Sequence, residues 1–151
     1  MNDQTPPAAR LGPDTLRSVE LTRTGPMTLE ARNARGAVLP VGSGDGAEFT
    51  PVELLLVALG GCGAIDLEHV TGKRVAPDRL DVRVEGHKIR DENGNHMVGL
   101  TVLLDVAFPQ GEEGDRAREI TPRAIRQVQD RLCTVGRTIQ LGDPVVYRER
   151  A

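Results

Sequence analysis

The chain has 151 residues, 38% of them apolar, which fits one domain with a hydrophobic core of its own. It has 19 basic and 22 acidic residues, a net charge of −3, and only two Phe, one Tyr and no Trp. Nucleic acid is therefore not an expected partner, because binding it takes a basic patch and stacking side chains. No apolar run approaches the roughly 20 residues of a membrane span, and the polar N-terminus is unlike a signal peptide. We expect no membrane partner and a cytoplasmic location.

Residues 1 to 14 contain three prolines and little hydrophobic patterning, which predicts an N-terminal arm. Residues 15–151 are expected to form a single domain. Short runs of strand-forming residues follow the arm at 18–23, 27–32 and 37–41, separated by turn residues, and they predict an antiparallel meander. The Gly-rich loop 42–49 lacks the spacing of a phosphate-binding loop, so we interpret it as a connector or a flexible active-site loop.

A helix is predicted from Thr50 to Val70. Thr50 can cap it, Pro51 suits its first position, and Glu53 puts a carboxylate in its first turn. Apart from Glu53, every residue from 52 to 59 is apolar, so we expect this helix to be a core element covered on all sides.

Three glycines surround a cysteine in the middle of this helix, in the sequence Gly60-Gly61-Cys62-Gly63. Each glycine costs about 1 kcal/mol relative to alanine in a helix interior. We interpret them as room for a second backbone, or for a substrate, next to the Cys62 thiol.

The second half of the chain predicts a hairpin and a second helix. Alternating apolar residues mark strands at 80–85 and 98–108, joined by a turn at 91–95 that lacks the glycine and glutamate of a calcium loop. Residues 109–119 are predicted to be a charged loop, and a helix is predicted from Thr121 to near Cys133. A short run at 139–141 and a final strand at 145–147 complete an α+β fold.

The two cysteines, Cys62 and Cys133, are 71 residues apart, so they do not form a CxxC motif. With three histidines spread along the chain, a four-ligand zinc site would need scattered residues, and we expect neither a metal nor a cofactor. Redox chemistry and simple burial of two small residues both stay open from spacing alone.

Two segments resemble a known family. The sequence TPVELLLVALGGC, followed some seventy residues later by LCTVGRTI, is similar to the OsmC/Ohr family of thiol-dependent peroxidases over roughly residues 16–148. The resemblance implies an intertwined homodimer, with antiparallel sheets wrapped around a long central helix and a second helix. It also implies two active sites at the subunit interface.

By the same resemblance, Cys62 is the peroxidatic cysteine and Cys133 the resolving one. The implied substrates are organic hydroperoxides or hydrogen peroxide, in defence against oxidative stress. The Cys62 thiolate would become a sulfenic acid and then a disulfide with Cys133, and a dithiol such as a lipoylated protein would reduce it.

A cysteine in mid-helix gains little from the helix N-terminus, so its thiolate needs a nearby cation. The family pairs a glutamate at the helix start with an arginine; here Glu53 stands nine residues before Cys62. Glu53 can equally serve as a helix-start charge alone. Asp66 and His69 share the Cys62 face and are interpreted as ending the apolar region. The candidate arginines are Arg23, Arg32, Arg35 and Arg137, of which we favour Arg137 and Arg32.

A second function fits the same fold. The chain would then be a dimeric binding module or redox sensor that holds a small hydrophobic ligand at the subunit interface, with its cysteines used for packing or slow oxidation.

Overall fold

The computed structural model describes residues 11–150. The chain divides into two compact units, one up to Pro51 and one from Val52 onward, and each is described by itself. The predicted arm lies mostly outside the described residues, and the single domain expected over 15–151 stays a prediction. The elements in chain order are β1 (Val19–Gly25), β2 (Thr28–Asn33), β3 (Val38–Val41), α1 (Pro51–Thr71), β4 (Arg79–Asp91), β5 (Gly94–Ala107), α2 (Glu112–Gln127), the π-helix η1 (Val128–Leu132) and α3 (Thr134–Leu141).

The N-terminal unit is an antiparallel sheet with the strand order β1-β2-β3. Leu21 pairs with Ala31, and Ala31 pairs in turn with Leu39. The predicted meander is therefore confirmed, with strand ends within two residues of the expected positions.

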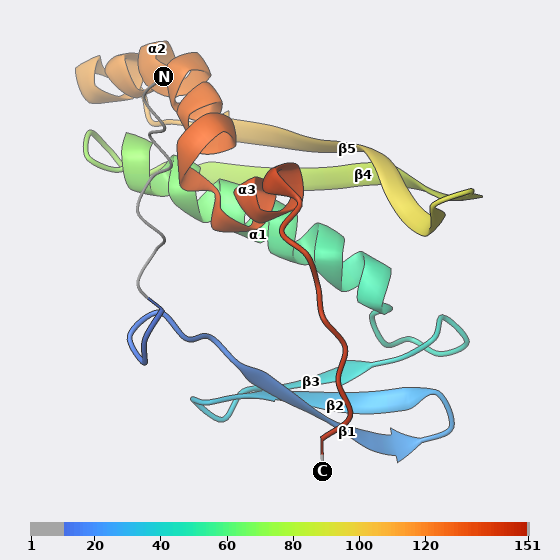
Figure 1. The fold of residues 1–151 in the computed structure, drawn as a ribbon. Coiled ribbons are helices and arrows are strands. Elements are labelled where there is room, and N and C mark those ends of the chain that lie inside the picture. Colours follow the sequence, from blue (N-terminus) through green and yellow to red (C-terminus); the bar gives the residue numbers. More distant parts are fainter. Residues whose placement is uncertain (1–10, 151) are drawn as a thin grey trace. The chain divides into compact units, whose positions relative to one another are not determined.

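The second unit is organised around α1, which runs alongside the β4–β5 hairpin (Figure 1). The helix begins at Pro51 and ends at Thr71, where the Gly72 N–H donates to the Glu68 carbonyl at 2.7 Å. The predicted helix is confirmed at both ends, including its glycine stop.

Within the second unit, one face of α1 is not covered, contrary to the expectation that the helix is buried on all sides. Leu67 is fully buried, but Val57 is 51% exposed and Ile65 is 70% exposed.

Helix α1 is also long and apolar enough to span a membrane, so the expectation that no such segment exists was wrong. Core helices of soluble proteins meet the same criterion, and α1 contributes Leu59 and Leu67 to a core with α2 and η1.

The β4–β5 hairpin covers the other face of α1. Its strands pair in antiparallel register, with Val82 opposite Leu104, and both are longer than the alternating apolar residues predicted. The side chains that pack against the core alternate along both strands: Leu80, Val84, Leu100, Val102, Leu104 and Val106. This alternation is the period of a strand with one buried face, so the predicted hairpin is confirmed.

The glycines of α1 have different surroundings. A Cβ at Gly60 would lie 2.5 Å from Val84 Cγ2, so this glycine lets the helix approach β4 closely. A Cβ at Gly61 would meet nothing within 4 Å, and one at Gly63 would meet only Val128, at 4.0 Å. The predicted close approach is therefore found at Gly60 and not at Gly61 among the residues described.

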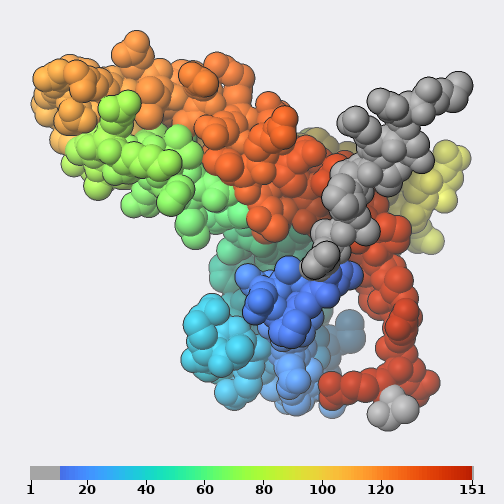
Figure 2. All heavy atoms as spheres, turned by 60° about the vertical axis from the view of Figure 1, so that its left-hand side comes forward, coloured from blue at the N-terminus to red at the C-terminus, as the bar shows by residue number. Residues whose placement is uncertain are grey.

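The C-terminal third differs from the sequence-based expectations. Helix α2 begins at Glu112, inside the segment predicted as a charged loop. It lies against the end of α1, as the orange and green spheres of Figure 2 show, and it lines a pocket together with Arg74, which follows α1. Residues 139–141 belong to α3, and residues 145–147 form no strand. Gly114 and Ala117, buried on α2, are too small to mark a helical period by hydrophobicity, which explains why this part of the helix was missed.

Candidate functional site

The π-helix η1 brings Cys133 into position. Its last turn closes with a hydrogen bond from the Cys133 N–H to the Val128 carbonyl, five residues earlier, at 3.0 Å. The backbone then becomes extended at Cys133, which is the N-cap of α3. The Gly136 N–H donates to Cys133 Sγ at 3.3 Å. Short π-helical turns are frequent at functional sites, because they shift the side chains that follow out of the regular helical register.

Two residues of α1 meet this sulfur. Cys62 and Asp66 are four residues apart and therefore lie on one face of the helix. The Cys62 thiol donates to Asp66 Oδ2 at 3.8 Å. The two sulfurs and a carboxylate oxygen of Asp66 all lie within 4.8 Å of one another. Residues distant in the sequence thus converge on one cluster of two thiols and a carboxylate.

The two thiols differ in exposure and in charge environment. Cys133 is 4% exposed, whereas Cys62 is half-buried. Burial raises the pKa of the Cys133 thiol, the Gly136 N–H opposes this, and the Cys62 thiol and the Asp66 carboxylate raise that pKa further. Cys133 is therefore a protonated thiol at neutral pH.

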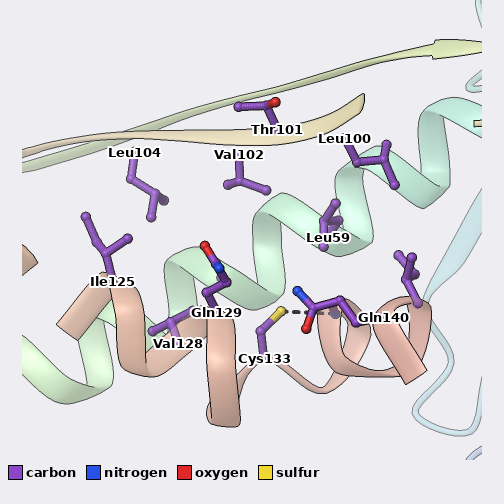
Figure 3. A pocket seen from close by; sticks show the side chains of 13 residues that line it. Leu59, Leu100, Thr101, Val102, Leu104, Ile125, Val128, Gln129, Cys133 and Gln140 are labelled. Atoms are coloured by element: carbon purple, nitrogen blue, oxygen red, sulfur yellow. Dashed lines mark hydrogen bonds between the residues drawn. The ribbon is translucent and has the colours of Figure 1, made fainter. Parts of the chain in front are cut away.

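Cys133 also lines a cavity of about 410 Å³. Figure 3 shows β5 side chains on one side of this cavity, Leu59 of α1 beside them, and side chains of α2, η1 and α3 facing them. Most of the lining side chains are apolar, and Thr101, Gln129 and Gln140 are the polar ones besides the thiol. Gly136 lets Cys133 and Leu59 approach the α3 backbone closely, because a Cβ at this position would lie 3.3 Å from Cys133 Sγ and 3.4 Å from Leu59 Cδ1.

The other candidates are not members of the sulfur cluster. Glu53 is in the first turn of the same continuous helix, nine residues before Cys62, which is about 13–14 Å along the axis. Arg137 is on α3, where its guanidinium donates to Gln140 Oε1 at 2.6 Å. Arg32 lies on β2 in the N-terminal unit and pairs with Glu30 at 2.5 Å. Among residues 52–150, no arginine or lysine side chain hydrogen-bonds or pairs with the three clustered residues.

The sequence analysis interprets Asp66 only as the end of an apolar stretch and does not predict its contact with the Cys62 thiol. The available signal was its position one helical turn after Cys62, which places its carboxylate beside the thiol. The sequence analysis considered only histidines as further metal ligands, whereas the structure places the Asp66 carboxylate beside the two cysteines.

Comparison with known proteins gives consistent results. Residues 43–148 match the family model described as OsmC-like protein. An uncharacterised protein of Mycobacterium tuberculosis is 34% identical over 125 residues, covering 82% of this chain and 88% of that protein. An OsmC-like protein from Mycoplasma pneumoniae has a TM-score of 0.66 at 15% identity, covering 84% of this chain and 89% of the other. The organic hydroperoxide resistance protein OhrB of Bacillus subtilis has a TM-score of 0.56 at 15% identity, covering 80% and 90%.

Proposed function

Because the chain belongs to the family of OsmC-like proteins, we propose that it is a thiol-dependent peroxidase that reduces organic hydroperoxides or hydrogen peroxide through Cys62 and Cys133. The observation that carries this proposal is the convergence of the two sulfurs within 4.8 Å beside a largely apolar cavity. Two free thiols 71 residues apart have no local reason to meet.

The reaction exchanges electrons among these two sulfurs, a peroxide and a dithiol. The Cys62 thiolate attacks the O–O bond, forms a sulfenic acid, and releases an alkoxide or hydroxide that takes up a proton. The Cys133 thiol then attacks the Cys62 sulfur, a disulfide forms, and water leaves. An external dithiol, such as a lipoylated protein, reduces the disulfide and is itself oxidised to a disulfide.

The geometry favours this division of roles. Disulfide formation brings the sulfurs to about 2.05 Å, so from at most 4.8 Å they must approach by less than 3 Å, within the reach of side-chain rotation. Cys62 is the more exposed thiol, which suits the sulfur that meets the oxidant first. Cys133, protonated and buried, suits the thiol that waits for a sulfenic acid.

A preference for organic hydroperoxides follows from the cavity, which is lined by Cys133, whose sulfur lies within 4.8 Å of the Cys62 sulfur. Leu59, Val102 and Ile125 are among the apolar side chains that would contact the carbon portion of such a substrate. Burying this portion stabilises the complex by about 25 cal/mol per Å² of apolar surface. Hydrogen peroxide lacks an apolar portion and gains nothing from these walls. The structurally similar protein from Bacillus subtilis is named an organic hydroperoxide resistance protein, which is consistent with this preference.

Thiolate formation at Cys62 requires a proton acceptor and a stabilising charge. Asp66 Oδ2, which accepts the thiol hydrogen bond, is the acceptor that we assign. Arg137 and Arg32 stay our candidates for the cation, with Glu53 as their acidic partner. We favour Arg137 as the cation, since it lies four residues after Cys133 and donates a hydrogen bond to Gln140, which lines the cavity.

We propose further that the protein is a cytoplasmic homodimer. Val57 and Ile65 expose apolar surface on α1, and burying this surface against a second copy would remove the cost of leaving it in water. A partner subunit could also supply an arginine to the thiols, which hydrogen-bond to none among residues 52–150.

A steady-state assay tests the peroxidase. Consumption of cumene hydroperoxide is measured with dihydrolipoamide as reductant and with a chelator present, for the wild type, Cys62→Ser and Cys133→Ser. We expect turnover in the wild type and none with Cys62→Ser. Cys133→Ser should turn over more slowly, because the dithiol must then reduce the Cys62 sulfenic acid directly. Turnover that survives Cys62→Ser would refute the assignment.

The binding-module alternative draws on the same cavity of about 410 Å³, which is large enough for a small apolar molecule. It predicts ligand binding that is indifferent to both substitutions and no peroxide turnover. The same three proteins, titrated with a fluorescent apolar probe, therefore separate the two functions.

A further inference from the structure

The cluster of Cys62, Asp66 and Cys133 has the composition of a metal site as well as of a redox site. Thiolate sulfur and carboxylate oxygen are both ligands of Zn²⁺, and three such atoms lie within 4.8 Å of one another. We propose that the reduced protein binds one Zn²⁺ per chain through Cys62 Sγ, Cys133 Sγ and an Asp66 carboxylate oxygen. The bound ion keeps both thiols from oxidation, a consequence that rests on the proposed peroxidase function.

The distances fit tetrahedral coordination. Zn–S bonds of about 2.3 Å and Zn–O bonds of about 2.1 Å place neighbouring ligand atoms about 3.6–3.8 Å apart. Cys62 Sγ and Asp66 Oδ2 are already 3.8 Å apart. The widest separation, at most 4.8 Å, must shrink by about 1 Å, which small side-chain rotations achieve.

The ligands are held on ordered elements. Cys62 and Asp66 lie one turn apart on the same face of α1, the spacing at which two side chains of a helix bind one ion. Cys133 is fixed at the junction of η1 and α3, where the Gly136 N–H donates to its sulfur. A hydrogen bond of this kind stabilises a metal-bound thiolate and orients it toward the ion.

The local charge also favours a cation. Two thiolates and a carboxylate would place three negative charges together, and no basic side chain among residues 52–150 hydrogen-bonds or pairs with them. A divalent ion compensates two of these charges directly. Binding converts two thiols and one carboxylate into ligands and releases two protons, so no oxidant or reductant is consumed.

The ligand set selects the metal. Soft thiolates disfavour Mg²⁺ and Ca²⁺, which take oxygen ligands in larger numbers. Zn²⁺ accepts two sulfurs and an oxygen, does not itself oxidise thiols, and fills a fourth position with water. Since both reactive sulfurs are then coordinated, the zinc-bound protein cannot begin the sulfenic acid cycle.

The direct test is a Zn²⁺ titration of the reduced protein without peroxide, in competition with a chromogenic chelator. We expect one ion per chain with a dissociation constant on the order of 1 μM or lower. Asp66→Asn should weaken binding by at least about tenfold, because it removes an anionic ligand and keeps the side-chain shape. Glu68→Gln removes the same charge two residues along α1, at an exposed position outside the cluster, and should bind as the wild type does.

Cobalt gives a second measurement that reports the ligands themselves. Co²⁺ added to the reduced wild type should produce thiolate-to-metal charge-transfer absorption, absent in Cys62→Ser and in Cys133→Ser. Zinc should also protect both thiols of the wild type from iodoacetamide. Equal zinc affinity in the wild type and Asp66→Asn, or no sulfur-to-cobalt absorption, would overturn the site.

The two proposals fail separately. Zinc binding is measured without peroxide, and peroxide turnover is measured with a chelator. A protein that turns over peroxide but gives none of the metal signals refutes the zinc site alone. A protein that binds zinc through the cluster but shows no turnover supports the site and refutes the peroxidase.

Discussion

The close approach of α1 to β4 at Gly60 yields a sharp prediction, because the neighbouring Gly61 provides a matched control. In Gly60→Ala, the new Cβ would lie 2.5 Å from Val84 Cγ2 and 3.2 Å from Val82 Cγ1. Ordinary contacts of this kind are 3.4–4 Å, so helix or strand must move by about 1 Å. In Gly61→Ala, the new Cβ meets nothing within 4 Å.

The expected energies follow from two opposing effects. Each alanine gains about 1 kcal/mol of helix propensity over glycine. Overpacking at Gly60 costs about 1–3 kcal/mol, because the β-branched valines on β4 have little rotamer freedom. Gly60→Ala should therefore lie between neutral and about 2 kcal/mol destabilised. Gly61→Ala should be stabilised by about 1 kcal/mol in the monomer, where its face of α1 stays uncovered.

Urea unfolding followed by circular dichroism measures the difference, at one protein concentration so that any dimerisation affects all samples alike. We expect a gap of about 1–3 kcal/mol between the variants, or roughly 2–12 °C in melting temperature. Equal midpoints would refute the close packing of α1 on β4 at Gly60. A Gly61→Ala variant less stable than the wild type would instead indicate that a second copy covers the face of α1 that Gly61 shares with Val57 and Ile65.

Four further predictions address the core, the exposed face, the cation and the buried thiol. Leu67→Ala should lower the free energy of unfolding by about 2–5 kcal/mol, because Leu67 is fully buried, and an unchanged urea midpoint would contradict its place in the core. Ile65→Asp should convert a dimer to a monomer in light scattering, since Ile65 is 70% exposed in one chain, and an intact dimer would remove this face from the interface. Arg137→Ala should lower kcat/KM for cumene hydroperoxide by about tenfold or more and Arg32→Ala by less, whereas the reverse order would assign the cation to Arg32. Cys133 should be alkylated appreciably only above pH 9.0, the ordinary pKa of a thiol, since its own pKa is raised in the folded state. Its contribution to stability should be present below that pH and lost as the pH rises through the raised pKa. Full alkylation of Cys133 at pH 8, read by peptide mass spectrometry, would contradict this.

Much of the fold could be predicted from local patterns. Pro51 and Gly72 bound α1 as their conformational preferences require, and the alternation from Leu80 and from Val98 identified the β4–β5 hairpin. These signals are local, because capping and period-2 burial depend on neighbours in the sequence. The first turns of α2 were not predicted, because their buried residues, Gly114 and Ala117, are too small to give a hydrophobic period.

The site was predictable only in part. Cys62 and Cys133 could be selected from the family resemblance, but their approach to within 4.8 Å depends on the π-helix before Cys133, which no sequence pattern indicated. Asp66 joins them through helical spacing, a signal that the sequence does contain. The source of an activating cation was not predictable, because it depends on packing between elements far apart in the chain.

The disulfide itself tests the central claim most directly. Reduced protein is mixed with one equivalent of cumene hydroperoxide, quenched with acid at times from milliseconds to minutes, alkylated, and digested for mass spectrometry. The account predicts that a peptide pair joined through Cys62 and Cys133 appears within seconds and disappears when dihydrolipoamide is added. Slow accumulation of sulfinic or sulfonic acid on either cysteine, with no joined peptide, would contradict it.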